Sequence, residues 1–172
     1  MSNPPVEVQQ YGQSIWIDNI SRKLLEDGTF RKWIDDTGVV GVTSNPTIFQ
    51  KAIGGSDDYD DEIRTILDEE PMAIYEQLAI ADIQGATKMF RPIYDATNGR
   101  DGYVSLEVSP LLVHKTQETI DEAKRLFKAV DAPNVMIKIP ATPEGIPAIE
   151  EVIAAGINVN VTLIFAVSNY IE

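Results

Sequence analysis

Five short runs rich in β-branched and aliphatic residues alternate along the chain with longer segments of helical period. The predicted strands are residues 14–18, 39–45, 103–109, 134–140 and 157–164. The predicted helices are residues 21–34, 56–67, 71–90, 111–130 and 143–155. Alternating strand and helix units pair their strands in parallel, because each helix returns the chain to the same end of the sheet. The pattern therefore predicts an α/β fold with a parallel sheet.

The predicted strands carry an aliphatic row on one side and a polar row on the other. In the third strand the residues at 104, 106 and 108 are aliphatic, and those at 105, 107 and 109 are polar. Strands covered by helices on both faces are usually apolar on both rows, whereas in a closed parallel barrel the second row points at the axis. We therefore expect six polar side chains to surround one cavity: Asp18, Asn45, Glu107, Lys138, Asn160 and Thr162.

Lys138 is the one charged residue in the run VMIKIP at residues 135–140. Burial disfavours the charged form of a lysine, and a neutral amine is a nucleophile that forms Schiff bases with ketones. The structural alternative is an ammonium paired with Glu107 or Asp18, but a buried pair usually costs as much desolvation as it returns. We therefore favour a catalytic Lys138 acting on a sugar ketone.

The other polar residues each have two interpretations. Beside an amine, the carboxylates of Asp18 and Glu107 would supply proton transfer for imine formation and carbon-carbon cleavage, although acids near strand ends are also common as helix caps or solvated loop residues. Asn45, Asn160 and Thr162 would bind substrate hydroxyls or a water molecule. Their structural alternative is turn or strand-end chemistry, above all for Asn45, because it precedes a proline.

Composition excludes several other functions. The 172 residues are 44% hydrophobic and 24% charged, which predicts one soluble domain over residues 1–172. A formal charge of -13 argues against nucleic acids and anionic membranes as partners. The absence of cysteine and the single histidine, His114, argue against thiolate chemistry and a metal cluster, and there is no glycine-rich nucleotide-binding motif. Without a leader or a spanning segment, the expected location is the cytoplasm.

Three segments closely resemble the transaldolase family. They are GVTSNPTIF at residues 41–49, VMIKIPATPEGI at residues 135–146 and INVNVTLI at residues 157–164. The resemblance runs from Ser14 to the C-terminus. It implies a (β/α)8 TIM barrel of the class I aldolase type, without a cofactor, that transfers a dihydroxyacetone unit between sugar phosphates in the pentose phosphate pathway.

The resemblance also implies a role for each site residue. Lys138 would form the imine with the ketose, and Asp18 would be the acid and base on the sugar hydroxyl. Glu107 and Thr162 would hold the water that carries protons during imine formation and hydrolysis. Asn45 and Asn160 would bind hydroxyls of the dihydroxyacetone unit.

Two features qualify this resemblance. The sister family of fructose 6-phosphate aldolases shares the lysine but generally has glutamine at the position of Glu107, which favours a transaldolase. The family's barrel has eight strands, and only five are predicted here, so we expect a partial barrel domain that lacks strands six to eight and the family's phosphate-binding serine and arginine. The alternatives to catalysis by this chain are an inactive fragment, an interaction module, and an aldolase-like lyase. The sequence does not predict an oligomeric state.

Overall fold

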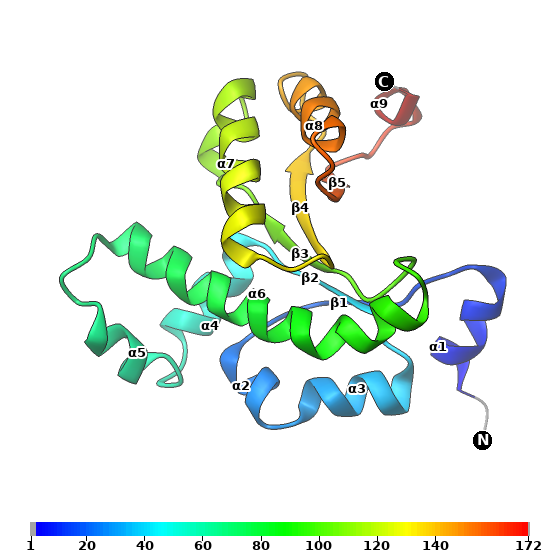
Figure 1. The fold of residues 1–172 in the computed structure, drawn as a ribbon, viewed down its shortest axis with the longest axis horizontal. Helices are drawn as coiled ribbons and strands as arrows, with labels where there is room; N and C mark the ends of the chain where they lie inside the picture. The colour runs from blue at the N-terminus through cyan, green and yellow to red at the C-terminus, as the bar shows by residue number, and fades with distance from the viewer. Residues whose placement is uncertain (1–2, 172) are drawn as a thin grey trace.

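The five predicted strands form one parallel sheet in the structure, a computed structural model that describes residues 3–171. The strands are β1 (Trp16–Asp18), β2 (Gly41–Thr43), β3 (Val104–Glu107), β4 (Val135–Pro140) and β5 (Val159–Thr162). Their order in the sheet is β1-β2-β3-β4-β5, so each strand pairs with the next one along the chain. Figure 1 shows the strand direction turning from β1 to β4, so the sheet is a curled half-barrel and the predicted fold class is confirmed.

Helices cover the outer side of this sheet and connect its strands. The α-helices are α1 (Pro4–Glu7), α2 (Arg22–Glu26), α3 (Thr29–Thr37), α4 (Pro46–Gly54), α5 (Asp60–Thr65), α6 (Pro71–Ala96), α7 (Thr116–Val130), α8 (Gly145–Ala154) and α9 (Val167–Ile171). Two 3₁₀ turns, η1 (Val8–Tyr11) and η2 (Pro110–Leu112), precede β1 and α7. In Figure 1, α7 and α8 lie beside each other, and α6 crosses the sheet near α2 and α3.

Several predicted helix boundaries are wrong. The segment 21–34 is two helices, because Gly28 adopts a left-handed conformation with φ 83° that interrupts the helical hydrogen bonds. The helix predicted over 111–130 begins only at Thr116, after a 3₁₀ turn, and the one predicted from residue 143 begins at Gly145. Helix α6 continues through Pro92 to Ala96, beyond its predicted end.

Helix α4 was not predicted at all. The prediction extended the second strand to residue 45, but β2 ends at Thr43 and Asn45 is the N-cap of α4. Its side-chain Oδ1 accepts a hydrogen bond from the Ile48 backbone N–H at 3.0 Å. Asparagine at the N-cap followed by proline at the first helical position is a common helix start. The helix predicted over residues 56–67 is shorter in the structure: α5 begins at Asp60 and ends at Thr65.

The outer, aliphatic row of the sheet is the centre of the core. Fully buried residues of three neighbouring strands belong to it: Val42, Val104, Val135, Ile137 and Ile139. They pack against buried side chains of α6, α7 and α8. Burial of one such side chain contributes about 1.5–3 kcal/mol to folding, so this row stabilises the fold while the inner row stays free for polar groups.

The inner row contains an aromatic residue at the amino ends of the strands. Trp16 is paired in register with Gly41, and its indole occupies the space that a β-carbon would need at residue 41. Gly41 therefore permits the ring to lie against the β2 backbone. The sequence did not assign a place to Trp16, whose row was otherwise polar.

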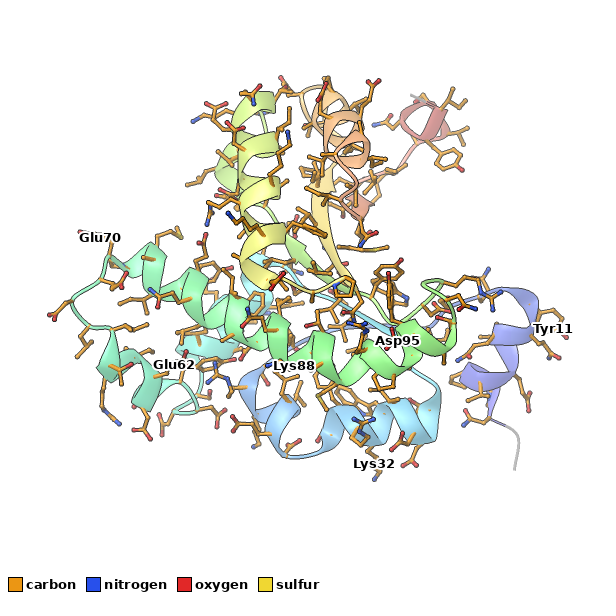
Figure 2. The ribbon with its side chains drawn as sticks, viewed as in Figure 1. Tyr11, Lys32, Glu62, Glu70, Lys88 and Asp95 are labelled. Atoms are coloured by element: carbon orange, nitrogen blue, oxygen red, sulfur yellow. The ribbon has the colours of Figure 1, made fainter. Side chains whose placement is uncertain are left out.

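An ionic group on the helical side, which we call the Arg22 cluster, joins α2, α5 and α6. It consists of Arg22, Tyr59, Glu62 and Asp82. Arg22 contacts Asp82 at 2.6 Å and Glu62 at 2.7 Å, and the Tyr59 hydroxyl donates to Asp82 at 2.7 Å. Figure 2 shows Glu62 on α5, at the end of the molecule away from Tyr11. The cluster fixes this projecting end to the barrel wall.

Candidate active site

Three of the predicted site residues lie in one row across β3, β4 and β5, which we call the Lys138 row. Glu107 is paired in register with Lys138, and Lys138 with Asn160. Paired residues of neighbouring parallel strands project from the same face of a sheet. Because the alternating residues Leu106 and Ile137 are in the outer core, the row faces the inside of the curl.

Lys138 is held by two oxygen acceptors. Its Nζ lies 3.4 Å from Glu107 Oε2 and donates to the Ser44 backbone carbonyl at 3.3 Å. The side chain of Lys138 is only 13% exposed and that of Glu107 is 19% exposed. The ion pair that was the structural alternative is therefore present, and it lies on the inner face of the sheet, where Glu107 also lines a cavity.

The carboxyl group of Glu107 is suited to exchanging protons. Burial raises its pKa above the ordinary glutamate value, the charge and hydrogen bond of Lys138 partly oppose this rise, and the negative charge of Asp18 adds to it. A carboxyl group with a raised pKa takes up and releases a proton closer to neutral pH. Glu107 is therefore placed to hold a proton beside the amine.

Asp18 lies at the carboxyl end of β1, exposed to solvent and paired in register with Thr43. The hydroxyl Oγ1 of Thr43 is buried and has no hydrogen-bond partner among the described residues. A buried hydroxyl without a partner costs about 1–3 kcal/mol, so this position favours a bound water or substrate group. Asp18 and Thr43 thus extend the polar inner face to β1 and β2.

Asn45 combines a structural contact with a position at the cavity. While its Oδ1 caps α4, the residue also lines an open cavity of about 460 Å³ together with Pro46, Lys51, Glu107 and Pro110. The cavity connects the start of α4 to the Glu107 end of the Lys138 row. The structural alternative for Asn45 is therefore present as a helix cap. The cap uses only the side-chain oxygen, so the amide nitrogen can still donate a hydrogen bond.

Asn160 is oriented by a hydroxyl on a strand that is not its neighbour. Its Nδ2 donates to Ser105 Oγ at 2.8 Å, and the Ser105 backbone carbonyl accepts a hydrogen bond from Ser44 Oγ at 2.7 Å. Both serines are fully buried. Hydrogen bonds through Ser105 therefore link β2, β3 and β5 beneath the Lys138 row.

Thr162 lies further toward the carboxyl end of β5 than Asn160. It is paired in register with Pro140, two residues beyond Lys138, and is partly buried. Its spacing from Asn160 places both side chains on the same face of β5. Of the six predicted residues, Glu107, Lys138 and Asn160 thus form one row, and Asn45 and Glu107 line the open cavity.

Known proteins of similar sequence show the family of this chain. The sequence model of the family described as "Transaldolase/Fructose-6-phosphate aldolase" matches residues 15–172. The chain belongs to this family. It is 48% identical to "Transaldolase 2" of a Nostoc species over 172 residues, which cover 99% of the chain and 45% of that protein. It is 47% identical to "Transaldolase" of Trichodesmium erythraeum over 174 residues, covering 100% and 46%.

A third relative shows a similar identity and a similar partial coverage. "Transaldolase 1" of Streptomyces avermitilis is 50% identical over 166 residues, which are 94% of the chain and 43% of that protein. The chain therefore spans less than half the length of the curated transaldolases that it matches.

Other features of this transaldolase-family chain do not suggest a metal site. His114 is exposed in the connection after β3, with its Nδ1 3.4 Å from Glu144 Oε2. Among residues 3–171 there is no group of three or more histidine, aspartate and glutamate side chains that could hold a metal ion. None of the helices described is long and apolar enough to cross a membrane.

Sequence reasoning missed three residues that contact or adjoin the candidate site. Ser105 was visible as a small polar residue in the inner row, but its bond to Asn160 crosses β4 and leaves no local signal. Thr43 also belonged to a polar row but was not singled out. Ser44 gave no signal, because it acts through a backbone carbonyl and a hydroxyl bond to another backbone.

Proposed function

We propose that the protein containing this chain is a transaldolase that moves a dihydroxyacetone unit from sedoheptulose 7-phosphate to glyceraldehyde 3-phosphate. The products are erythrose 4-phosphate and fructose 6-phosphate. The observation that carries the proposal is the contact of Lys138 with Glu107 on the inner face of a barrel wall, in register with Asn160. Membership of the family and the names of the relatives support it.

In the proposed mechanism the Lys138 amine adds to the ketose carbonyl and the adduct loses water to give a protonated imine. Asp18 then takes the proton of the sugar hydroxyl as the carbon-carbon bond breaks, and the electron pair of that bond moves into the imine. The aldose product leaves, the remaining enamine attacks the acceptor aldehyde, and Asp18 returns its proton to the oxygen of that aldehyde while the imine forms again. Hydrolysis of the new imine returns the free amine, so electrons and protons balance over the cycle.

The remaining site residues would assist these proton transfers. Glu107, with its raised pKa, and Thr162 would hold the water that delivers and removes protons at the imine carbon. Asn160, oriented by its bond to Ser105, and Asn45 would bind the hydroxyl groups of the dihydroxyacetone unit. The proposed reaction needs no cofactor, because the lysine itself provides the electron sink.

We further propose that the chain contributes to one barrel domain of a cytoplasmic enzyme of the pentose phosphate pathway. Because relatives are more than twice as long, the remaining strands and the phosphate-binding groups would come from sequence outside these residues. Exposed apolar side chains after β5 support this, since Phe165 is 89% and Tyr170 is 77% exposed. Sugar phosphates are the proposed partners, rather than nucleic acids or membranes.

Borohydride trapping tests the imine directly. The protein is incubated with fructose 6-phosphate, reduced with sodium borohydride, digested and analysed by mass spectrometry. We expect a sugar adduct on Lys138 in the wild type and none in the Lys138→Ala variant. Absence of the adduct in a folded wild-type sample would contradict the proposal and favour an inactive fragment or an interaction module.

A lyase of the fructose 6-phosphate aldolase type is the second candidate, because the family model covers both enzymes. Both reactions pass through the Lys138 imine, so trapping does not separate them. The test is to incubate fructose 6-phosphate without an acceptor aldehyde and to measure free dihydroxyacetone. A transaldolase retains the unit until an acceptor arrives, whereas sustained release would establish the lyase.

A further inference from the structure

Ser44, which follows the last residue of β2, contacts the amine of Lys138 through its backbone carbonyl. The Nζ–O distance is 3.3 Å. The Ser44 side chain is fully buried, and its Oγ donates to the Ser105 carbonyl on β3 at 2.7 Å. The carbonyl that accepts from the lysine and the hydroxyl that bonds to β3 thus belong to the same residue.

The hydroxyl bond matters because β2 and β3 are paired over a short length. Their register consists of the single pair Val42 and Val104, supported by the bond from the Val42 N–H to the Tyr103 carbonyl at 3.0 Å. Ser44 lies two residues beyond this pair, where the chain turns toward α4. The bond from Ser44 Oγ to Ser105 therefore fixes the distance between the two strands where the carbonyl meets Lys138.

We propose that Ser44 is a positioning residue for imine formation. The hydrogen bond from the Ser44 hydroxyl holds the Ser44 carbonyl in place. This carbonyl oxygen then accepts the single N–H that remains on the Lys138 nitrogen in the imine. This inference rests on the proposed Schiff-base function. In this proposal the N–H of the imine keeps its hydrogen bond to the Ser44 carbonyl and loses its hydrogen bond to Glu107.

The hydrogen count of the reaction separates these two acceptors. An ammonium nitrogen carries three hydrogens, and the nitrogen of a protonated imine carries one. When the amine adds to the ketone and water leaves, one N–H therefore remains for two oxygens, Ser44 O and Glu107 Oε2. If the fixed carbonyl keeps it, the carboxyl group is free to give its proton to the departing hydroxyl and to recover it during hydrolysis.

The test compares Ser44→Ala with Thr87→Val in the protein that contains this chain. Thr87 is a matched control, because its buried hydroxyl also donates to a backbone carbonyl, that of Gln84, on α6. We expect Ser44→Ala to lower kcat for the transfer reaction by about 10- to 100-fold, the size of effect that a small misplacement of reacting groups produces. The KM for the donor should stay within about twofold. Equal kcat values for the two variants would overturn the proposal.

A second measurement does not depend on the reaction. Competitive labelling with acetic anhydride, read by mass spectrometry, compares the rate at Lys138 with that at exposed Lys23. Ser44→Ala should increase the ratio by about tenfold, the worth of one hydrogen bond to a charged group, because a displaced carbonyl holds the ammonium less firmly. An unchanged ratio would overturn the proposal. If the wild type forms no imine but Ser44→Ala still increases the labelling ratio, the proposed function is refuted, while the contact between Ser44 and Lys138 is confirmed.

Discussion

The Lys138 row and the Arg22 cluster both bury charge in the same chain, but they hold it differently. In the Arg22 cluster the contacts are 2.6–2.7 Å and Asp82 is fully buried between a cation and a phenol. In the Lys138 row the contacts are 3.3–3.4 Å, and neither charged side chain is as fully buried as Asp82. Short contacts to a fully buried carboxylate indicate a structural role, whereas longer contacts beside a cavity leave the groups able to change partners.

The Lys138→Ala variant should produce the largest effect in this comparison. We expect transfer activity to fall by at least about 10⁴-fold, because no other amine replaces the nucleophile. Far-ultraviolet circular dichroism should show a folded protein, since the removed contacts are long and partly solvated. Lys128→Ala, an exposed position on α7, is the control and should remain active. Unfolding of Lys138→Ala alone would instead assign the Lys138 row a structural role.

Arg22→Met should produce the largest loss of stability. It leaves the Asp82 carboxylate buried without its cation, which costs about 3–5 kcal/mol in the free energy of unfolding. Urea denaturation followed by circular dichroism measures this loss. The matched control is Arg64→Met, whose pairs with Asp60 and Asp61 are exposed and contribute less than about 1 kcal/mol. Equal effects of the two substitutions would show that burial does not distinguish the Arg22 cluster.

Glu107→Gln retains the shape of the side chain but removes its proton exchange. We expect kcat to fall by about 10²–10³-fold. In the wild type, activity should rise with pH through the raised pKa of Glu107, because the carboxylate form increases as pH rises, and this acidic limb should lie above the ordinary glutamate range. A pH profile of kcat from pH 4 to 8 measures both effects. An identical acidic limb in the variant would assign the titration to another group.

Tyr59→Phe should have the smallest effect. It removes the hydrogen bond to the buried Asp82 and the acceptor of the Arg22 backbone N–H, but it leaves the guanidinium pairs in place, so we expect a loss of about 1–2 kcal/mol. Tyr103→Phe is the control, because its hydroxyl donates to the carbonyl of Gly99 and leaves no charge behind. Thermal unfolding of both variants provides the measurement. A larger loss for Tyr103→Phe would contradict the view that the Arg22 cluster depends on short contacts to a buried carboxylate.

The sequence predicted the strands and their inner row because both depend on alternation, a property of neighbouring residues. Glu107, Lys138 and Asn160 were expected on one face, and the register places them in one row. The roles assigned to them remain predictions, since geometry alone does not reveal a reaction. The helix that begins at Pro46 was missed, although its asparagine cap and proline were visible in the sequence.

The Arg22 cluster could not be predicted from the sequence. Arg22 and Asp82 are 60 residues apart, and Tyr59 and Asp82 are 23 apart, so no local pattern relates them. The contact between the two serines beneath the Lys138 row was not predicted for the same reason, because Ser44 and Ser105 are 61 residues apart in the sequence. Contacts that depend on how helices and strands meet in space become visible only after the chain is folded.

The pairing of Trp16 with Gly41 gives the inner face a spectroscopic reporter. The chain has two tryptophans, and the other, Trp33, packs against the ring of Phe30 with 5.5 Å between ring centroids. Trp16 instead lies on the inner face, partly exposed, against the backbone of β2. In a Trp33→Phe background, the emission wavelength of Trp16 would report on water and ligands inside the curl, so filling of the barrel interior could be followed by fluorescence without an added dye.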